Sequence, residues 1–301
     1  MQQTVRYLIF SVSNRMLKPV FRISMLMGGL LFYNCQKELT SESIEQPFLY
    51  DSIPVIRPLS PVVNEISGIA DSKNKKGFLW GHEDSGRPPQ VHLISHDGTV
   101  VKKVFLKGIS NRDWEDMDLF NNEIYIGEIG DNAESFSSYR IHKFNEPDAN
   151  TDTVTSIETI NFTYPDGSHD AEAFFVDPVT KHIYIITKRS KPSKLYKLSF
   201  PYAADNVVSY ETDLPYTGVV GAAVSPDGRE IIVKTYTHLY HYKRSSGAGI
   251  EKTLSKNYQT LPYLIEPQGE AVCFASNGSG YFTISEKGFS TGVSVYFYKR
   301  K

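Results

Sequence analysis

Residues 169–174 read His169-Asp170-Ala171-Glu172-Ala173-Phe174, a polar and acidic start followed by a small-residue, apolar strand. Related segments occur five times after residue 60. One column through the five copies contains Ser67, Glu115, Glu172, Val220 and Glu270, which are separated by 48, 57, 48 and 50 residues. A recurrence at this period is typical of a propeller or a solenoid array.

The third copy shows the strand pattern most clearly. Short β-rich runs cover residues 171–176, 182–187, 194–200 and 206–212, with turn residues between them. Four antiparallel strands in succession make one propeller blade. The fourth copy repeats the pattern at 221–224, 229–235, 239–243 and near 251–255. No long apolar stripe with helical spacing follows residue 36, so we expect helix to be a minor component.

The fifth copy supplies three strands, at residues 271–274, 280–285 and 293–298. We expect the fourth strand to come from residues 47–56, which precede the first copy. This pairing closes the ring and hides sheet edges that would otherwise associate. The sequence therefore predicts an all-β fold, a single β-propeller of five four-stranded blades closed by an N-terminal strand, with six blades as the alternative.

The first 34 residues are different in kind. They contain four basic residues and no acid, and an apolar run at 23–33 lies just before Cys35. This pattern is typical of an export signal, and the run is too short to be a stable membrane anchor. Either Met1 or Met16 fits as the start. Cys35 resembles the lipidated first residue of a bacterial lipoprotein; ordinary cleavage and an uncleaved anchor are the alternatives.

These features predict three segments: an export signal peptide at 1–34, a flexible tether at 35–46 and the propeller at 47–301. We expect an exported monomer that is lipid-anchored to a bacterial membrane, periplasmic or at the cell surface, with membrane contact through the anchor only. Without residues 1–34, the chain has 28 basic and 34 acidic side chains, a formal charge of −6. This mildly acidic charge, without a basic cluster, argues against a nucleic-acid partner.

A candidate site follows from the blade geometry. The starts of first strands and the ends of second strands meet at one mouth of the central channel. The predicted ligand-binding residues there are Glu115, His169, Glu172, Lys188, Arg189, Lys234, Tyr236 and Glu270. Glu115, Glu172 and Glu270 could hold a hard cation such as calcium, or act as acid and base. The alternative is that each accepts backbone N–H bonds from a neighbouring blade.

Two further residues of this region have two interpretations each. His169 could be a metal ligand, but no dense ligand motif surrounds it, and a hydrogen-bonded loop histidine is the alternative. Trp114 could be a stacking platform for a sugar, or it could pack between blades.

Three motifs carry a family resemblance: Asp113-Trp114-Glu115-Asp116, residues 126–132, and residues 164–173 with Thr187-Lys188. They resemble a family of exported bacterial β-propeller lipoproteins of unassigned function, over residues 62–300. The chain is more distantly similar to phytase-like esterase and gluconolactonase-type propellers, which implies channel acids that hold a divalent cation. Because Val220 and Ala223 replace acids in the fourth copy, a symmetric metal ring is not expected.

Two functions remain as hypotheses. The first is a non-catalytic lipoprotein that binds a small molecule, glycan, peptide or partner protein at the polar mouth. The second is a divalent-metal-dependent hydrolase of phosphoesters or lactones, in which Lys188, Arg189 and Lys234 hold an anionic substrate. The sequence identifies no nucleophile, and it leaves open whether the chain is an enzyme and whether it uses calcium, another divalent cation or no cofactor.

Overall fold

A computed structural model describes residues 49–301, which contain the strands β1–β22 and one short helix, α1 (Ile250–Leu254). The predicted signal peptide, the tether with Cys35, and residues 47 and 48 of the predicted closing strand lie outside the described residues. No helix of the described part is long and apolar enough to cross a membrane.

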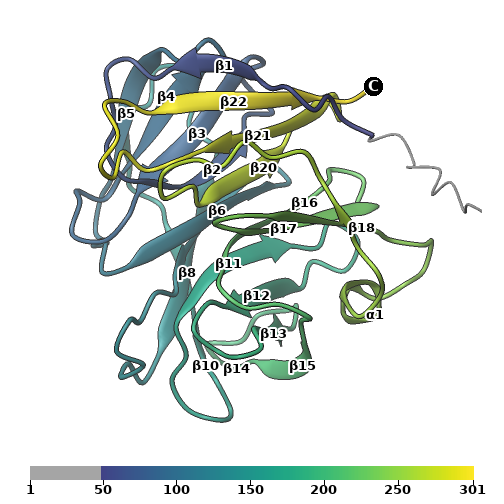
Figure 1. Ribbon diagram of the computed structural model, residues 1–301. Coiled ribbons are helices and arrows are strands. Elements are labelled where there is room, and N and C mark those ends of the chain that lie inside the picture. The colour runs from purple at the N-terminus through teal and green to yellow at the C-terminus, as the bar shows by residue number, and fades with distance from the viewer. Residues whose placement is uncertain (1–48) are drawn as a thin grey trace, which may run out of the picture. The chain divides into compact units, whose positions relative to one another are not determined.

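The strands form five separate sheets, one for each copy of the repeat (Figure 1). We number the sheets as blades 1 to 5. Blade 1 contains β2 (Ile66–Asp71), β3 (Phe78–Glu83), β4 (Gln90–Ser95), β5 (Val100–Leu106) and β9 (Thr153–Val154). Blade 2 contains β6 (Trp114–Phe120), β7 (Glu123–Glu128), β8 (Tyr139–Asn145), β10 (Glu158–Thr163) and β14 (Asp205–Val207).

The other three blades have four strands each. Blade 3 contains β11 (Ala171–Val176), β12 (Ile183–Thr187), β13 (Lys194–Leu198) and β15 (Ser209–Asp213). Blade 4 contains β16 (Val219–Val224), β17 (Glu230–Thr235), β18 (Leu239–Lys243) and β19 (Gln259–Thr260). Blade 5 contains β20 (Ala271–Phe274), β21 (Gly280–Ile284), β22 (Ser294–Lys299) and β1 (Val55–Pro58).

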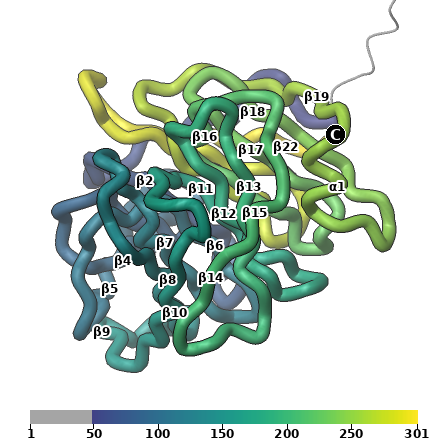
Figure 2. The backbone as a smooth tube through the Cα atoms, turned by 90° about the horizontal axis from the view of Figure 1, so that it is seen from below, coloured from purple at the N-terminus to yellow at the C-terminus, as the bar shows by residue number. Residues whose placement is uncertain are grey.

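The first strands of the five blades surround the centre. Around the ring, β2 contacts β6, β6 contacts β11, β11 contacts β16, β16 contacts β20, and β20 contacts β2 again. Figure 2 shows β6 and β11 inside the ring and β5, β9 and β10 toward its outside. An apolar cluster fills the space between each pair of neighbouring blades. The five-bladed propeller predicted from the repeat is therefore confirmed.

The N-terminal strand closes the ring as predicted. β1 pairs antiparallel with β22, from Val55 opposite Phe297 to Pro58 opposite Ser294, and Figure 1 shows the two strands side by side. Earlier in this segment, Tyr50 is fully buried, donates a hydrogen bond of 2.7 Å to Glu230 of blade 4 and accepts one of 2.7 Å from Arg300. Both ends of the propeller chain are thus held against blade 4 as well as against each other.

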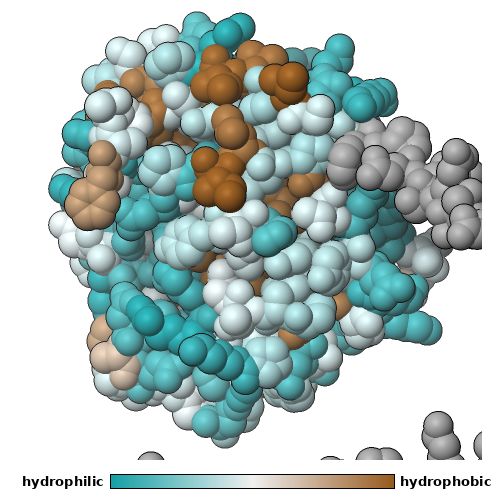
Figure 3. Space-filling model, in the orientation of Figure 1, coloured by the Kyte–Doolittle hydropathy of each residue, from teal (hydrophilic) through white to brown (hydrophobic). Residues whose placement is uncertain are grey.

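Hydrophobic side chains remain exposed over this closing strand. The face in Figure 3 is mainly hydrophilic, and its hydrophobic residues gather over the part that holds β1 and β22. The apolar residues exposed in this segment are Ile53, Val55 and Ile56. β1 therefore contributes its backbone to the sheet more than its side chains to the core.

Two strand predictions were wrong in detail. Residues near 251–255 form α1, and the fourth strand of blade 4 is β19. Ile250, Thr253 and Leu254 are buried on one side of α1, so tertiary packing outweighs the β-like appearance of the segment. The predicted strand 206–212 is split: β14 joins blade 2 in parallel pairing with β10, and β15 completes blade 3.

Candidate ligand site at the mouth of the channel

Four of the five residues of the repeat column lie at β-bulges of the inner strands. The pairing register shifts between Ile66 and Gly68, Trp114 and Met117, Ala171 and Ala173, and Val219 and Gly221. Each shift encloses the column residue of its blade: Ser67, Glu115, Glu172 and Val220 respectively. A bulge adds an unpaired residue to one strand and changes the direction of its side chain. In blades 2 and 3 the β-bulge therefore positions the column glutamates, Glu115 and Glu172.

Three glutamates of the column meet in the channel. Carboxylate oxygens of Glu115, Glu172 and Glu270, from blades 2, 3 and 5, all lie within 4.8 Å of one another, and their side chains are buried. Burial, and then the charge of Glu172, raises the pKa of Glu115 well above its usual range. Burial, and then the charge of Glu270, does the same to the pKa of Glu172. Burial also raises the pKa of Glu270, and it outweighs the hydrogen bond from Tyr236, which lowers this pKa.

Lys188 and Tyr236 complete this group. The Lys188 ammonium forms an ion pair with Glu172, lies 3.9 Å from Oε1 of Glu270 and donates a 3.2 Å hydrogen bond to the Tyr236 hydroxyl. That hydroxyl donates to Glu270 Oε1 at 2.5 Å. Burial lowers the pKa of Lys188, but the charge and hydrogen bond of Glu172, together with the charge of Glu270, outweigh burial and raise this pKa above its ordinary value. Lys188 is therefore positively charged at neutral pH.

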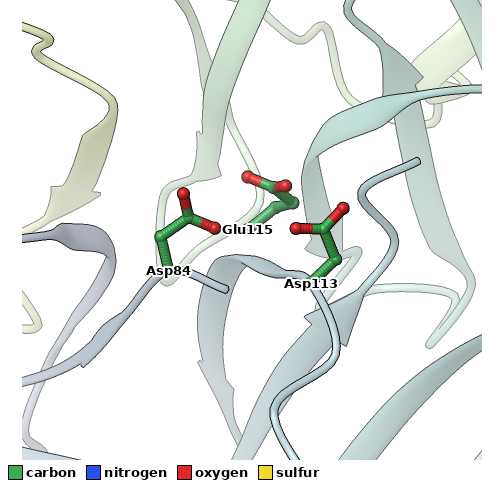
Figure 4. Close-up of side chains that lie close together, drawn as sticks. All are labelled: Asp84, Asp113 and Glu115. Carbon is green, nitrogen blue, oxygen red and sulfur yellow. The ribbon is translucent and has the colours of Figure 1, made fainter. Parts of the chain in front are cut away.

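A second acidic group shares Glu115. Carboxylate oxygens of Asp84, Asp113 and Glu115 also lie within 4.8 Å of one another (Figure 4). Asp84 follows β3, and Asp113 directly precedes β6. Burial raises the pKa of Asp84, and burial followed by the charges of Asp84 and Asp170 raises the pKa of Asp113 to about 6. Within residues 49–301, none of these three carboxylates forms an ion pair.

Glu286 adds another acid to the mouth. It follows β21, its backbone N–H donates to Gln268, and its side chain is buried. Burial, and then the charges of Glu270 and Asp84, raises its pKa to about 8. Asp84, Asp113 and Glu286 were not among the predicted ligand-binding residues. Because they lie at the starts of first strands or the ends of second strands, the sequence does place them at the mouth. No sequence signal distinguishes them from solvated turn residues.

The other predicted residues have partners outside this group. His169 Nε2 lies 2.9 Å from Asp166 Oδ1 and 2.8 Å from the Tyr196 hydroxyl. Arg189 Nε lies 2.8 Å from Asp170 Oδ2.

Lys234 is fully buried in the channel wall. Its ammonium donates to Glu266 at 3.2 Å and to the Ala271 carbonyl at 3.0 Å. Glu266 belongs to the loop between β19 and β20, and no repeat signal marks it.

Aspartates, and not the column glutamates, tie the blades together. The buried Asp116 carboxylate accepts backbone N–H bonds from Phe174 of blade 3 at 3.3 Å and from Ala222 of blade 4 at 3.2 Å. Asp118 accepts one from Val176 at 2.7 Å, and Asp71 accepts one from Ser276 at 2.6 Å. No backbone N–H of the described residues donates to the carboxylates of Glu115, Glu172 or Glu270. Accepting backbone N–H bonds from a neighbouring blade, which was the alternative role for the column glutamates, is therefore the role of these aspartates.

One fully buried carboxylate oxygen of the column has no hydrogen-bond partner among the described residues. Oε2 of Glu172 is buried and unpartnered among the described residues, while Oε1 faces Lys188. A buried polar atom without a partner costs about 1–3 kcal/mol. Trp114, in contrast, is fully buried between blades 1 and 2, edge-to-face with His82 at 5.8 Å. It is a packing residue and offers no platform at the mouth.

No protein-family model matches the chain, and no curated protein sequence matches it. Among solved structures, a chain of the crystal structure of a nidogen/laminin complex matches with a TM-score of 0.46 and 12% identity, covering 74% of this chain and 72% of that one.

Proposed function

We propose that this chain is an exported, lipid-anchored binding protein whose propeller takes a positively charged group of its ligand into the acidic mouth of the channel. The observation that carries this proposal is the crowding of buried carboxylates around Glu115. Lys188 is the cationic side chain that pairs with them. In the described part of the chain, these carboxylates accept no backbone N–H bond that would join one blade to the next. Acids that lie close together and have strongly perturbed pKa values are candidates for functional positions.

The energetics favour a cationic ligand. Two carboxylate charges 4.8 Å apart repel each other by about 3 kcal/mol at an effective dielectric constant of about 20. An inserted positive charge relieves this repulsion and provides a partner for the unpaired oxygen of Glu172. Trp114 is buried and therefore does not offer a sugar ring a stacking platform at the mouth. A basic peptide, a basic segment of a partner protein or a metal cation fits the mouth better than a neutral glycan.

The hydrolase hypothesis has less support. It needs Lys188, Arg189 and Lys234 to face a shared anionic substrate. In the described part of the chain, Arg189 is paired with Asp170, and Lys234 is buried against Glu266. Lys188 alone faces the carboxylates. Binding is therefore the function that the geometry supports best.

Melting curves of the full-length protein in detergent test the proposal. The probes are trilysine, calcium chloride and, as the acidic control, triglutamate. We expect at least one cationic probe to raise the melting temperature. The double variant Glu115→Gln with Glu172→Gln should lose this effect, because Glu115 belongs to both acidic groups, whereas Glu158→Gln, an exposed outer-strand control, should keep it. A cationic effect that is equal in all three proteins, or no effect at all, would contradict the proposal.

A further inference from the structure

We propose that Asp84, Asp113 and Glu115 form a calcium site at the mouth of the channel. The inference rests on the proposed function, since it specifies the positive charge that the mouth takes as a divalent cation. It differs from the sequence-based hypothesis, which placed the metal on Glu115, Glu172 and Glu270. Glu115 belongs to both groups.

The two groups differ in how their charge is already compensated. In the Glu115, Glu172 and Glu270 group, the Lys188 ammonium is within ion-pair distance of two carboxylates. An ammonium at that position opposes the binding of a second cation beside it. In the other group, no cationic side chain of residues 49–301 lies within 4 Å of any of the three carboxylates. Of the two groups, the carboxylates without an ion-pair partner in the described part of the chain are therefore Asp84, Asp113 and Glu115.

The carboxylates also have a suitable arrangement. Figure 4 shows the side chains of Asp84 and Asp113 coming from two separate loops and Glu115 pointing between them. Each pair of these oxygens lies within 4.8 Å, and two oxygens bound to one calcium ion at the usual Ca–O distance of up to about 2.6 Å can be at most about 5.2 Å apart. Gly130 lies against them, because a Cβ at this position would be 2.6 Å from Asp113 Oδ2 and closer still to Glu115 Oε1. The absence of a side chain at 130 leaves both carboxylates their room.

A neighbouring group provides an independent indication of a ligand. Glu172 is outside the proposed calcium site, is 96% buried, and presents the unpartnered Oε2. One of its carboxylate oxygens lies within 4.8 Å of an oxygen of Glu115. A buried oxygen without a partner, beside three carboxylates that form no ion pair within residues 49–301, is explained by a cation bound next to it.

The donor set indicates which cation. All donors of the group are carboxylate oxygens, with no histidine or cysteine among the residues of either acidic group. Hard oxygen donors favour calcium or magnesium over zinc and copper. Calcium accepts six to eight oxygens in a flexible geometry, whereas magnesium demands a near-ideal octahedron at about 2.0–2.1 Å. Side chains from two loops suit the more flexible ion.

Isothermal titration of the chelator-treated, full-length protein with calcium chloride tests the site. We expect one strong site per chain. Asp113→Asn should weaken calcium binding at least about tenfold, because it removes a charged ligand. Glu270→Gln should weaken it by a smaller factor, since Glu270 belongs to the other group. Asp205→Asn, an exposed control on β14, should leave it unchanged.

The outcomes separate the two proposals. Calcium binding that is lost in Glu270→Gln but kept in Asp113→Asn would overturn the inference and assign the cation to the other group. If calcium does not bind but trilysine stabilises the protein through Glu115 and Glu172, the calcium site is refuted and the binding function stands. If neither probe binds, both proposals fail. Melting in chelator verifies that each variant is folded, and Asp84→Asn replaces Asp113→Asn if the latter is not.

Discussion

Lys188 of blade 3 lies 3.9 Å from Glu270 of blade 5, so one ammonium faces carboxylates of two blades that are not neighbours in the ring. Its ion pair with Glu172 comes from its own blade. The pair is largely buried, and the third carboxylate, Glu115, belongs to blade 2. A single lysine therefore limits the repulsion between acids from two of the five blades.

Removal of this lysine should destabilise the protein. We expect Lys188→Met to lower the free energy of unfolding by about 3 kcal/mol, because it leaves buried carboxylates without their cation. Adding Glu172→Gln should restore part of the loss, with a coupling of about 1 kcal/mol or more. Urea unfolding measures both. Lys102→Met, which breaks an ion pair with the exposed Asp152, should cost only about 0–1 kcal/mol; additive effects at Lys188 and Glu172 would disprove the coupling.

Glu286 should make stability depend on pH. Burial and the neighbouring acids raise its pKa to about 8 in the folded protein, from about 4.5. Between these values the unfolded chain has lost the proton and the folded protein retains it, so rising pH favours unfolding. In chelator, Glu286→Gln should gain stability relative to wild type, by about 1 kcal/mol or more as the pH rises from 5 to 9. A difference that is constant over this range would show that Glu286 titrates normally.

The closing strand should be essential for the fifth blade. Deletion of residues 36–46 should leave thermal stability nearly unchanged, because the sequence predicts a polar tether there. Deletion of residues 36–56 removes Tyr50 with its bonds to Glu230 and Arg300, removes half of β1 and exposes the edge of β22. We expect that protein to aggregate on concentration. Thermal melting and size-exclusion chromatography compare the two; identical behaviour would refute closure by this strand.

Much of the fold could be predicted from the sequence, because each blade repeats the same local pattern. The column through Glu115, Glu172 and Glu270 gave both the number of blades and the place where its acids meet. The β-bulges could not be predicted, since a bulge is a property of the pairing between two strands. The helix α1 was missed because five residues are too short for a periodic signal.

The partners of the basic residues were beyond sequence reasoning. Arg189 and Lys234 were expected to face the column. Arg189 pairs instead with Asp170, and Lys234 pairs with Glu266 in the loop before β20. Which acid a base selects depends on loop conformation, and the repeat carries no information about it. Asp84 and Asp113 could be placed at the mouth from the sequence, but their approach to Glu115 could not be predicted, because two loops set it.

The anchor is a separate prediction, on residues outside the described part of the chain. The basic segment, the short apolar run and Cys35 predict lipidation. Metabolic labelling with a fatty-acid analogue should mark the wild-type protein, and Cys35→Ser should abolish the label. An exported wild-type protein that carries no label would rule out the lipoprotein assignment.

The central claim is that the mouth carboxylates form a site for positive charge and do not hold the propeller together, and Glu115→Gln tests it most directly. Glu115 belongs to both acidic groups, and its carboxylate accepts no backbone N–H bond within residues 49–301. The change removes one charge and keeps the shape. In chelator, the account predicts a melting temperature equal to or above that of wild type, and it predicts that calcium chloride stabilises the wild type but not the variant. A variant that melts several degrees lower in chelator, together with a wild type that calcium does not affect, would contradict the account.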